Sequence, residues 1–334
     1  MNTVRSGVRR AHVLATLLAI LIPAALFTGI APVHAQYPNK PIRFILPFPP
    51  GGGTDTLARI LGGKLAEGLA QQVILDNRPG AGANIGAELA AKAPPDGYTL
   101  LMGNIAHTIN MTLYRKLNYN FVKDFSAVSL LASAPNIVVV HPSVPANSVQ
   151  ELVAFAKSRP GKLNFGSAGT GGSVHLAGEL FKAMAGIDIT HVPYKGTSAA
   201  MPDLVSGRIE MMFPSAITAK PFSDNGRLKL LAVTSARRSP DVPQLPTIAE
   251  SGIAGFEVGI WYGLLAPAGT PPEIVRKLNA DIRDIVGTED FRAMMAKQGV
   301  TVAPGTPEQF SAFYEAEIRK WARVVADAKI PSIN

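Results

Sequence analysis

The 334-residue chain carries 32 basic and 24 acidic side chains, a formal net charge of +8, and no cysteine. The absence of cysteine excludes disulfides, thiolate metal sites and lipid attachment at a cysteine, so stability must come from buried cores. The basic side chains are spread along the chain without the runs typical of a nucleic-acid footprint, so no nucleic-acid partner is expected.

The first 35 residues have the three-part anatomy of an export signal. Three arginines among the first ten residues form a basic start, an apolar run covers residues 11–30, and Val33-His34-Ala35 supplies a small-x-small cleavage pattern. We expect cleavage there, a mature chain that begins at Gln36, and delivery to the periplasm. An uncleaved membrane anchor is the alternative, because the apolar run approaches the length that spans a bilayer.

Apolar runs of strand length alternate with helical patterns through most of the remaining chain. Strands are expected at residues 43–48, 73–76, 98–102, 128–131, 137–140, 163–165, 187–192, 209–213, 228–233 and 257–265. Helices are expected at residues 54–69, 83–91, 149–157, 174–185, 197–204, 272–286, 290–297 and 307–326. This alternation favours an α/β fold with open, mostly parallel sheets and helices on both faces.

Two stretches favour chain crossings between two lobes: Pro135 and the segment from Gly252 to Gly255. They predict a discontinuous first lobe, residues 36–135 plus 256–334, and an inserted second lobe, residues 136–255. Two crossings make a hinge, and ligands of open α/β sheets bind at the carboxyl ends of the strands. The expected ligand site is therefore the cleft between the lobes.

A glycine-rich loop from Phe48 to Asp55 follows the first expected strand and opens a helix. Its three glycines allow a tight turn with N–H groups pointing outward, and the helix N-terminus adds partial positive charge. The loop therefore resembles an anion cradle. It matches neither the Walker loop nor the dinucleotide-binding pattern, and a plain turn with an N-cap at Thr54 or Asp55 is the structural alternative.

A second loop of the same kind, residues 165–173, again joins a strand to a helix and offers backbone donors and three hydroxyls. Two such loops in separate lobes favour one carboxylate-bearing ligand held from both sides. Three shorter segments follow other strands and are further candidates: residues 78–84 with Asn84, residues 103–107 with Asn104, and residues 194–197 with Lys195. Capping remains the alternative for Asn84, and a solvated charge for Lys195.

Catalytic patterns are absent from the sequence. Ser167 and Ser173 each lack one of the two glycines of a nucleophile elbow, because Phe165 and His175 stand at those positions. His175 lies two residues after Ser173, and helix residues at that spacing do not face each other. No HExxH zinc motif is present. We therefore expect no enzyme activity, no catalytic residues, no metal site and no cofactor.

At these loops the chain resembles the solute-binding receptors of tripartite tricarboxylate transporters, the Bug receptor family. The resemblance extends over the expected mature chain and rests on several motifs taken together. They include PNKPIRFILPFPPGGGTDTLARILGGKL, NRPGAGANIGAELAAKAPPDGYTLL, NFGSAGTGGSVHLAGELFKAMAG, HVPYKGTSAAMPDLVSG, LAVTSARRSP and GLLAPAGTPPEIVRKLN.

The resemblance implies a two-lobed Venus-flytrap fold that binds a small carboxylate. It implies that the loops matching residues 49–55 and 167–170 hold the carboxylate through backbone amides, hydroxyls and water. It also implies delivery to a two-component membrane permease, and we expect a monomer. The predicted ligand contacts are Phe48, Pro50, Gly51, Gly52, Gly53, Thr54, Asp55, Asn84, Asn104, Ser167, Ala168, Gly169, Thr170, Ser173, Tyr194, Lys195 and Gly196.

Two segments depart from the family pattern. Pro214-Ser215 stands where members commonly carry Asp or Asn, and the segment from Asn104 to His107 lacks the usual hydroxyls. Both lie where ligand selectivity is expected. Three alternatives are open for His107: it narrows the pocket, offers a charge there, or points away. Two other functions remain open at this point: a periplasmic sensor that feeds a signalling protein, and a hydrolase with unrecognised chemistry.

Overall fold

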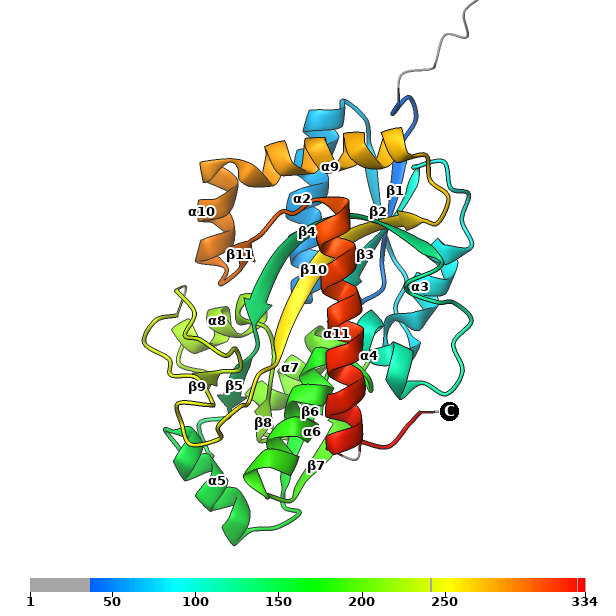
Figure 1. Cartoon of the computed structure of the whole chain (residues 1–334). Helices are drawn as coiled ribbons and strands as arrows, with labels where there is room; N and C mark the ends of the chain where they lie inside the picture. Colours follow the sequence, from blue (N-terminus) through cyan, green and yellow to red (C-terminus); the bar gives the residue numbers. More distant parts are fainter. Residues whose placement is uncertain (1–36, 241, 329, 334) are drawn as a thin grey trace, which may run out of the picture. The chain divides into compact units, whose positions relative to one another are not determined.

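Two β-sheets flanked by helices form the framework of the structure (Figure 1). The computed structural model describes residues 37–240, 242–328 and 330–333. The chain divides into two units, residues 1–39 and 40–334, and the elements below belong to the second. The predicted export signal lies outside the described residues and stays a prediction. Among the described residues, no helix has the length and apolar character needed to cross a membrane.

The first sheet has the strand order β11-β4-β10-β3-β1-β2. Its strands are β1 (Ile42–Leu46), β2 (Val73–Asn77), β3 (Thr99–Asn104), β4 (Phe125–Pro135), β10 (Gly259–Pro267) and β11 (Thr301–Val302). The second sheet has the order β7-β6-β8-β5-β9. Its strands are β5 (Ile137–Val140), β6 (Leu163–Ser167), β7 (Ile189–Pro193), β8 (Met211–Met212) and β9 (Lys229–Val233).

Both sheets are mixed rather than mostly parallel. In the first sheet, β10 and β11 run opposite to the other four strands. In the second sheet, β5 alone runs opposite to the other four. The antiparallel pairs arise where the chain passes from one sheet to the other. Strand β4 ends at Pro135 and continues through Asn136 into β5 of the second sheet, and β10 returns the chain to the first sheet. These direct connections contain no crossover helix, so they do not produce the parallel strand pairs that β-α-β units give. The predicted α/β class with two sheets flanked by helices is confirmed.

The helices bury one face each against the sheets. They are α2 (Gly53–Leu69), the 3₁₀ turn η2 (Ala81–Ala83), α3 (Asn84–Ala91), α4 (Ile105–Leu113), α5 (Val149–Ser158), α6 (Ser173–Ala185), α7 (Thr197–Val205), α8 (Ala216–Asp224), α9 (Pro272–Gly287), α10 (Glu289–Lys297) and α11 (Pro307–Asp327). In α2, for example, Leu57, Leu61 and Leu65 recur every four residues and are buried. That spacing gives the apolar stripe of a helix that packs on a core.

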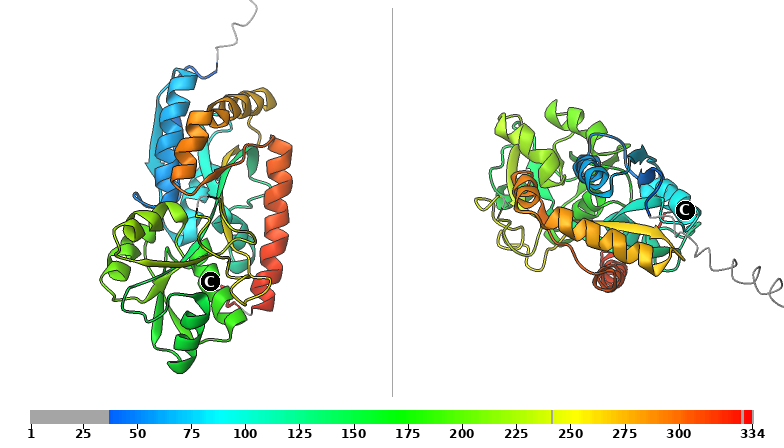
Figure 2. Two further views of the ribbon diagram at one scale, coloured as in Figure 1. Left: turned by 90° about the vertical axis from the view of Figure 1, so that its left-hand side faces the viewer. Right: turned by 90° about the horizontal axis from the view of Figure 1, so that it is seen from above.

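The C-terminal helix α11 extends from the level of the first sheet toward that of the second (Figures 1 and 2). Phe310, near its start, packs edge-on against Trp261 of β10. Near its end, Lys320, Val324 and Asp327 share a surface groove with Met184 of α6. The helix therefore contacts elements that carry both sheets.

Two helices were not predicted from the sequence. Residues 103–107 were expected to be an open loop, but α4 begins at Ile105. Asn104 and His107 form a reciprocal capping box at its N-terminus. Helix α8 has Pro221 in its interior, and proline disfavours a helix on propensity alone.

A pair of helical glycines tests how tightly α6 packs. A Cβ on Gly178 would clash with the Phe165 ring of β6, whereas a Cβ on Gly63 of α2 meets no atom within 4 Å. We expect Gly178→Ala to lower the free energy of unfolding by about 1–3 kcal/mol through overpacking. Gly63→Ala should raise it by about 0.5–1 kcal/mol, because alanine is the better helix former. Urea denaturation measures both, and equal effects would contradict the packing described here.

Candidate functional site

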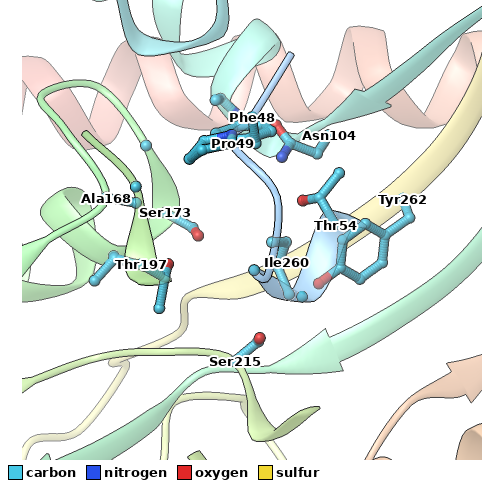
Figure 3. A pocket seen from close by; sticks show the side chains of 16 residues that line it. Phe48, Pro49, Thr54, Asn104, Ala168, Ser173, Thr197, Ser215, Ile260 and Tyr262 are labelled. Carbon is cyan, nitrogen blue, oxygen red and sulfur yellow. Dashed lines mark hydrogen bonds between the residues drawn. The ribbon is translucent and has the colours of Figure 1, made fainter. Parts of the chain in front are cut away.

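A small cavity of about 40 Å³ lies at the carboxyl ends of strands from both sheets (Figure 3). From the first sheet come Phe48, after β1, and Asn104, at the end of β3; from the second come Ala168, after β6, and Ser215, after β8. The remaining lining residues are Pro49, Gly52, Gly53, Thr54, Ala106, Gly172, Ser173, Val174, Gly196, Thr197, Ile260 and Tyr262. A molecule bound in this cavity therefore contacts loops that follow strands of both sheets.

Five helices begin at the wall of this cavity. Their N-cap residues are Gly52 for α2, Asn104 for α4, Gly172 for α6, Gly196 for α7 and Ser215 for α8, and all five line it. Only Asn104 caps its helix with its own side chain. The other four helices have no side-chain cap. Their first N–H groups have no partner within the helix and remain available as donors.

Among the described α-helices that begin elsewhere, α3 and α9 also lack a side-chain cap, but the other three have one. The helices α5, α10 and α11 are capped by the side chains of Ser148, Thr288 and Thr306, which accept hydrogen bonds from first-turn N–H groups. Glycine at an N-cap position supplies no such acceptor. The uncapped helix starts are therefore concentrated at the cavity.

Charged side chains are absent from the cavity wall. The lining consists of apolar, glycine, hydroxyl and amide residues from the described part of the chain. Each helix N-terminus carries roughly half a positive charge, and its N–H groups point outward. Together they make a region of positive potential without a buried cation, which suits a small anion such as a carboxylate.

Asp55 shapes the first glycine-rich loop and does not line the cavity. Its carboxylate accepts hydrogen bonds from Gly51 N–H at 3.0 Å, from Arg59 at 2.8 and 3.1 Å and from Asn77 at 3.0 Å. Burial alone would raise the pKa of Asp55, but these hydrogen bonds hold it below its usual value. Gly51 has φ +83°, a conformation that favours glycine. Asp55 thus braces the loop in this structure, and its contact with a ligand stays a prediction.

Two histidines brace the second loop from behind. The Ser167 hydroxyl lies 2.6 Å from His191 Nε2 and 3.1 Å from the Gly169 carbonyl oxygen. Gly171 N–H donates to His175 Nδ1 at 3.2 Å. Ser167, which is predicted to contact ligand, is fully buried, and its hydroxyl stabilises the turn. These contacts position the first turn of α6 at the cavity.

The same histidines belong to a group that has the composition of a metal site. Ligand atoms of His175, Glu179 and His191 lie within 4.8 Å of one another. However, Nδ1 of His175 accepts a hydrogen bond from the Gly171 N–H, so in the neutral ring the proton sits on Nε2, which lies 3.8 Å from a Glu179 carboxylate oxygen. A protonated nitrogen cannot ligate a metal, so in this arrangement His175 stabilises the loop through its hydrogen bond with Gly171.

A larger pocket of about 530 Å³ adjoins the cavity and shares Phe48, Pro49 and Ala168 with it. Its outer wall includes Thr170 and Lys195. Within the described chain, the Lys195 side chain makes no ion pair and is exposed. The pocket therefore gives space beyond the cavity for the body of a ligand larger than one carboxylate.

The predicted contacts divide into three groups. At the cavity lie Phe48, Gly52, Gly53, Thr54, Asn104, Ala168, Ser173 and Gly196. At the adjoining pocket lie Gly169, Thr170, Tyr194 and Lys195. Away from both lie Pro50, Gly51, Asp55, Asn84 and Ser167.

Two of the residues that lie away from the cavity have clear structural partners. Pro50 accepts a hydrogen bond from the Ser198 hydroxyl at 3.0 Å, which links the first loop to α7. Asn84 Oδ1 accepts hydrogen bonds from Asn110 at 2.9 Å and from Tyr119 at 2.8 Å. His107 is also removed from the cavity, because it is fully buried and stacks on Phe121 at 5.1 Å.

Sequence reasoning missed several lining residues. Tyr262 and Ile260 lie within a strand that looked like plain core, and no local pattern marks them. Thr197 was expected to begin a helix and lay in the candidate segment 194–197, but it was not among the predicted contacts. Ser215 was noted as a departure from the family pattern but was not counted as a contact, although it lines the cavity.

Residues 57–330 match the family described as the tripartite tricarboxylate transporter family receptor. The chain is 36% identical to Protein BugT of Bordetella pertussis over 315 residues, which cover 93% of this chain and 97% of that protein. Both comparisons extend over most of the chain, and the family match begins at residue 57, after the glycine-rich loop that contains Phe48 and Gly52.

Solved structures of other proteins have a similar overall fold. R. palustris Rpa4515 with adipate has a TM-score of 0.87 and 38% identity, covering 89% of this chain and all of that one. Periplasmic binding protein BugD has a TM-score of 0.85 and 32% identity, with 89% and 100% covered. MatC from Rhodopseudomonas palustris with bound malate has a TM-score of 0.81 and 33% identity, with 86% and 100% covered.

The buried histidines predict how stability depends on pH. Burial lowers the pKa of His175 to about 3 and of His107 to about 4. In the unfolded chain both titrate near 6.5, so between these values the unfolded state binds more protons. The free energy of unfolding should therefore fall as the pH is lowered from 6 to 4.5, by about 1.4 kcal/mol per pH unit for each histidine.

Urea denaturation across this pH range measures the slope. His175→Gln should reduce it by the share of one histidine, whatever its effect on stability at pH 7. An unchanged slope in that variant would show that His175 is protonated in the folded protein.

Proposed function

Because the chain belongs to the tripartite tricarboxylate transporter receptor family, the Bug receptors, we propose that it captures a small carboxylate and presents it to a two-component membrane permease. Members of this family are periplasmic binding receptors and not enzymes. The proposal places the mature chain, from Gln36, in the periplasm as a monomer.

The observation that carries the proposal is the set of five helix N-termini around one uncharged cavity. Carboxylate oxygens accept charge-assisted hydrogen bonds from such N–H groups. A buried lysine would also attract the anion, but desolvation of its charge would offset much of that attraction. The adipate and malate bound in Rpa4515 and MatC are acids of the same class.

The proposed lobes are residues 36–135 with 256–334, and residues 136–255. The first and second sheets fall into these two segments, and the cavity takes residues from each. Ser198 of the second segment already bonds to Pro50 of the first beside the cavity. Ligand capture by closure of the two lobes is therefore the proposed working motion.

Gly172→Asp tests the anion site without disturbing the fold. Gly172 has φ −87°, and a Cβ there meets no atom within 4 Å. Aspartate is a good N-cap residue, so α6 should be as stable as before or a few tenths of a kcal/mol more stable. The added carboxylate should occupy the N–H donors and repel the ligand, so that affinity for dicarboxylates such as adipate falls at least tenfold.

The control is Gly172→Asn, which adds the same volume without charge and should weaken binding less. Calorimetric titration measures affinity, and circular dichroism checks the fold. Adipate, malate and other small acids that all bind Gly172→Asp as tightly as the unaltered protein would contradict the proposed site.

Closure predicts a change of shape on binding. A ligand that contacts loops from both lobes shifts the population toward the closed state. We expect saturating ligand to reduce the radius of gyration in solution X-ray scattering and to raise the melting temperature. A bound ligand that raises the melting temperature but leaves the scattering curve of an initially open protein unchanged would argue against closure.

A further inference from the structure

The chain returns to the adjoining pocket after its last helix. The segment Ile330–Ile333 follows α11 and reaches the end of α4, where Ile333 pairs with Tyr114 in an isolated parallel bridge (Figure 1). Ile333 N–H donates to the Leu113 carbonyl oxygen at 2.8 Å, and Arg115 N–H donates to the Ile333 carbonyl oxygen at 3.0 Å. Two backbone hydrogen bonds therefore hold the segment against the end of α4.

This pairing decides which side chains face the pocket. In extended backbone, successive side chains point to opposite faces. Arg115 Nε donates to Ser332 Oγ at 2.9 Å, so these two side chains share one face. Tyr114 and Ile333, their neighbours in sequence, share the other face, and both line the adjoining pocket. The backbone bridge and the side-chain bond behind it therefore fix Ile333 at the pocket wall.

The wall formed by Tyr114 and Ile333 begins close to the cavity. The Tyr114 hydroxyl lies 2.9 Å from the point where a Cβ of Gly82 would stand, and the Tyr114 ring lies 3.3 Å from the corresponding point of Gly171. Gly171 directly precedes Gly172, which lines the cavity as the N-cap residue of α6. The same short stretch of the second loop thus touches the cavity on one side and the wall of the pocket on the other.

The chemistry of the pocket favours an apolar ligand body. Most of the side chains that line it are proline, alanine and aromatic residues, together with Ile333. Among the described residues that line it, Lys195 alone is charged. Ile333 and Tyr114 also pack against the hydrophobic core, which supports them from behind. Methylene groups placed in this pocket therefore leave water for an apolar surface, which favours binding.

We infer that Ile333 is a specificity-determining residue: with Tyr114 it forms the wall against which the end of the ligand remote from the cavity packs. The ligand class is then acids with an apolar body, six carbons long or longer, in preference to four-carbon acids. This inference rests on the proposed function, because it assumes that the cavity holds a carboxylate.

Acids of different length test it. Adipate has the same two carboxylates as succinate and two more methylene groups. By calorimetric titration, adipate should bind the unaltered protein at least threefold tighter than succinate, since each buried methylene group contributes roughly a fourfold gain in affinity when it is fully buried.

Ile333→Ala removes most of the apolar side chain from the wall. The affinity for adipate relative to succinate should fall at least threefold, because adipate loses contacts that succinate does not reach. Ile333→Leu keeps an apolar side chain of the same size and should keep the ratio. A substitution that only disturbed the fold would weaken the binding of both acids together, so the ratio separates recognition from folding.

Ile333→Asp tests where the far end of the ligand lies. The new carboxylate should repel the second carboxylate of adipate, so the affinity for adipate relative to hexanoate, the monocarboxylate of equal length, should fall at least fivefold. Ile74→Asp makes the same change of charge at an exposed residue of β2 that lines neither the cavity nor the pocket, and it should keep this ratio. Circular dichroism checks the fold of each variant.

The outcomes separate the two proposals. If succinate, adipate and hexanoate all fail to bind the unaltered protein, the proposed function and this inference both fall. If acids bind but succinate binds as tightly as adipate, or Ile333→Ala and Ile333→Asp both keep the ratios of the unaltered protein, the inference about Ile333 alone is overturned.

Discussion

Backbone N–H groups at the start of a helix need acceptors, and at this cavity four helices lack a side-chain cap. Glycine at three of these N-cap positions keeps the donors accessible, and an anion in the cavity can then accept hydrogen bonds from several of them. Polar side chains outside the cavity stabilise the two glycine-rich loops by hydrogen bonds. Asp55 holds the first loop, and Ser167 with His175 and His191 holds the second.

The two sheets supply this cavity because the chain crosses between them by strands. The continuous run from β4 into β5 and the return through β10 bring the strand ends of both sheets to one place. Tyr262 lies on the returning strand itself. The strand that connects the two sheets and the wall of the cavity thus share Tyr262 and Ile260.

Much of the site was visible in local sequence because its physical cause is local. A glycine-rich turn between an apolar strand and an amphipathic helix places N–H groups at a strand end whatever the rest of the fold does. Gly52, Gly53, Ser173 and Gly196 were predicted for this reason, and all line the cavity. Asp55 and Ser167 were predicted by their place in the same loops, but neither lines the cavity, and their side chains bond to Arg59 and His191.

By itself, the sequence determined the α/β class, most strand and helix positions and the two glycine-rich loops, because periodicity and turn chemistry act over a few residues. The tertiary structure decided the mixed strand directions, the helix at Ile105 and the choice of loop residues that face the cavity. It also brought Tyr262 and Ser215, 47 residues apart in the chain, to the same glycine of α2. Such pairs depend on how two sheets and their helices pack, and no short stretch of sequence encodes that packing.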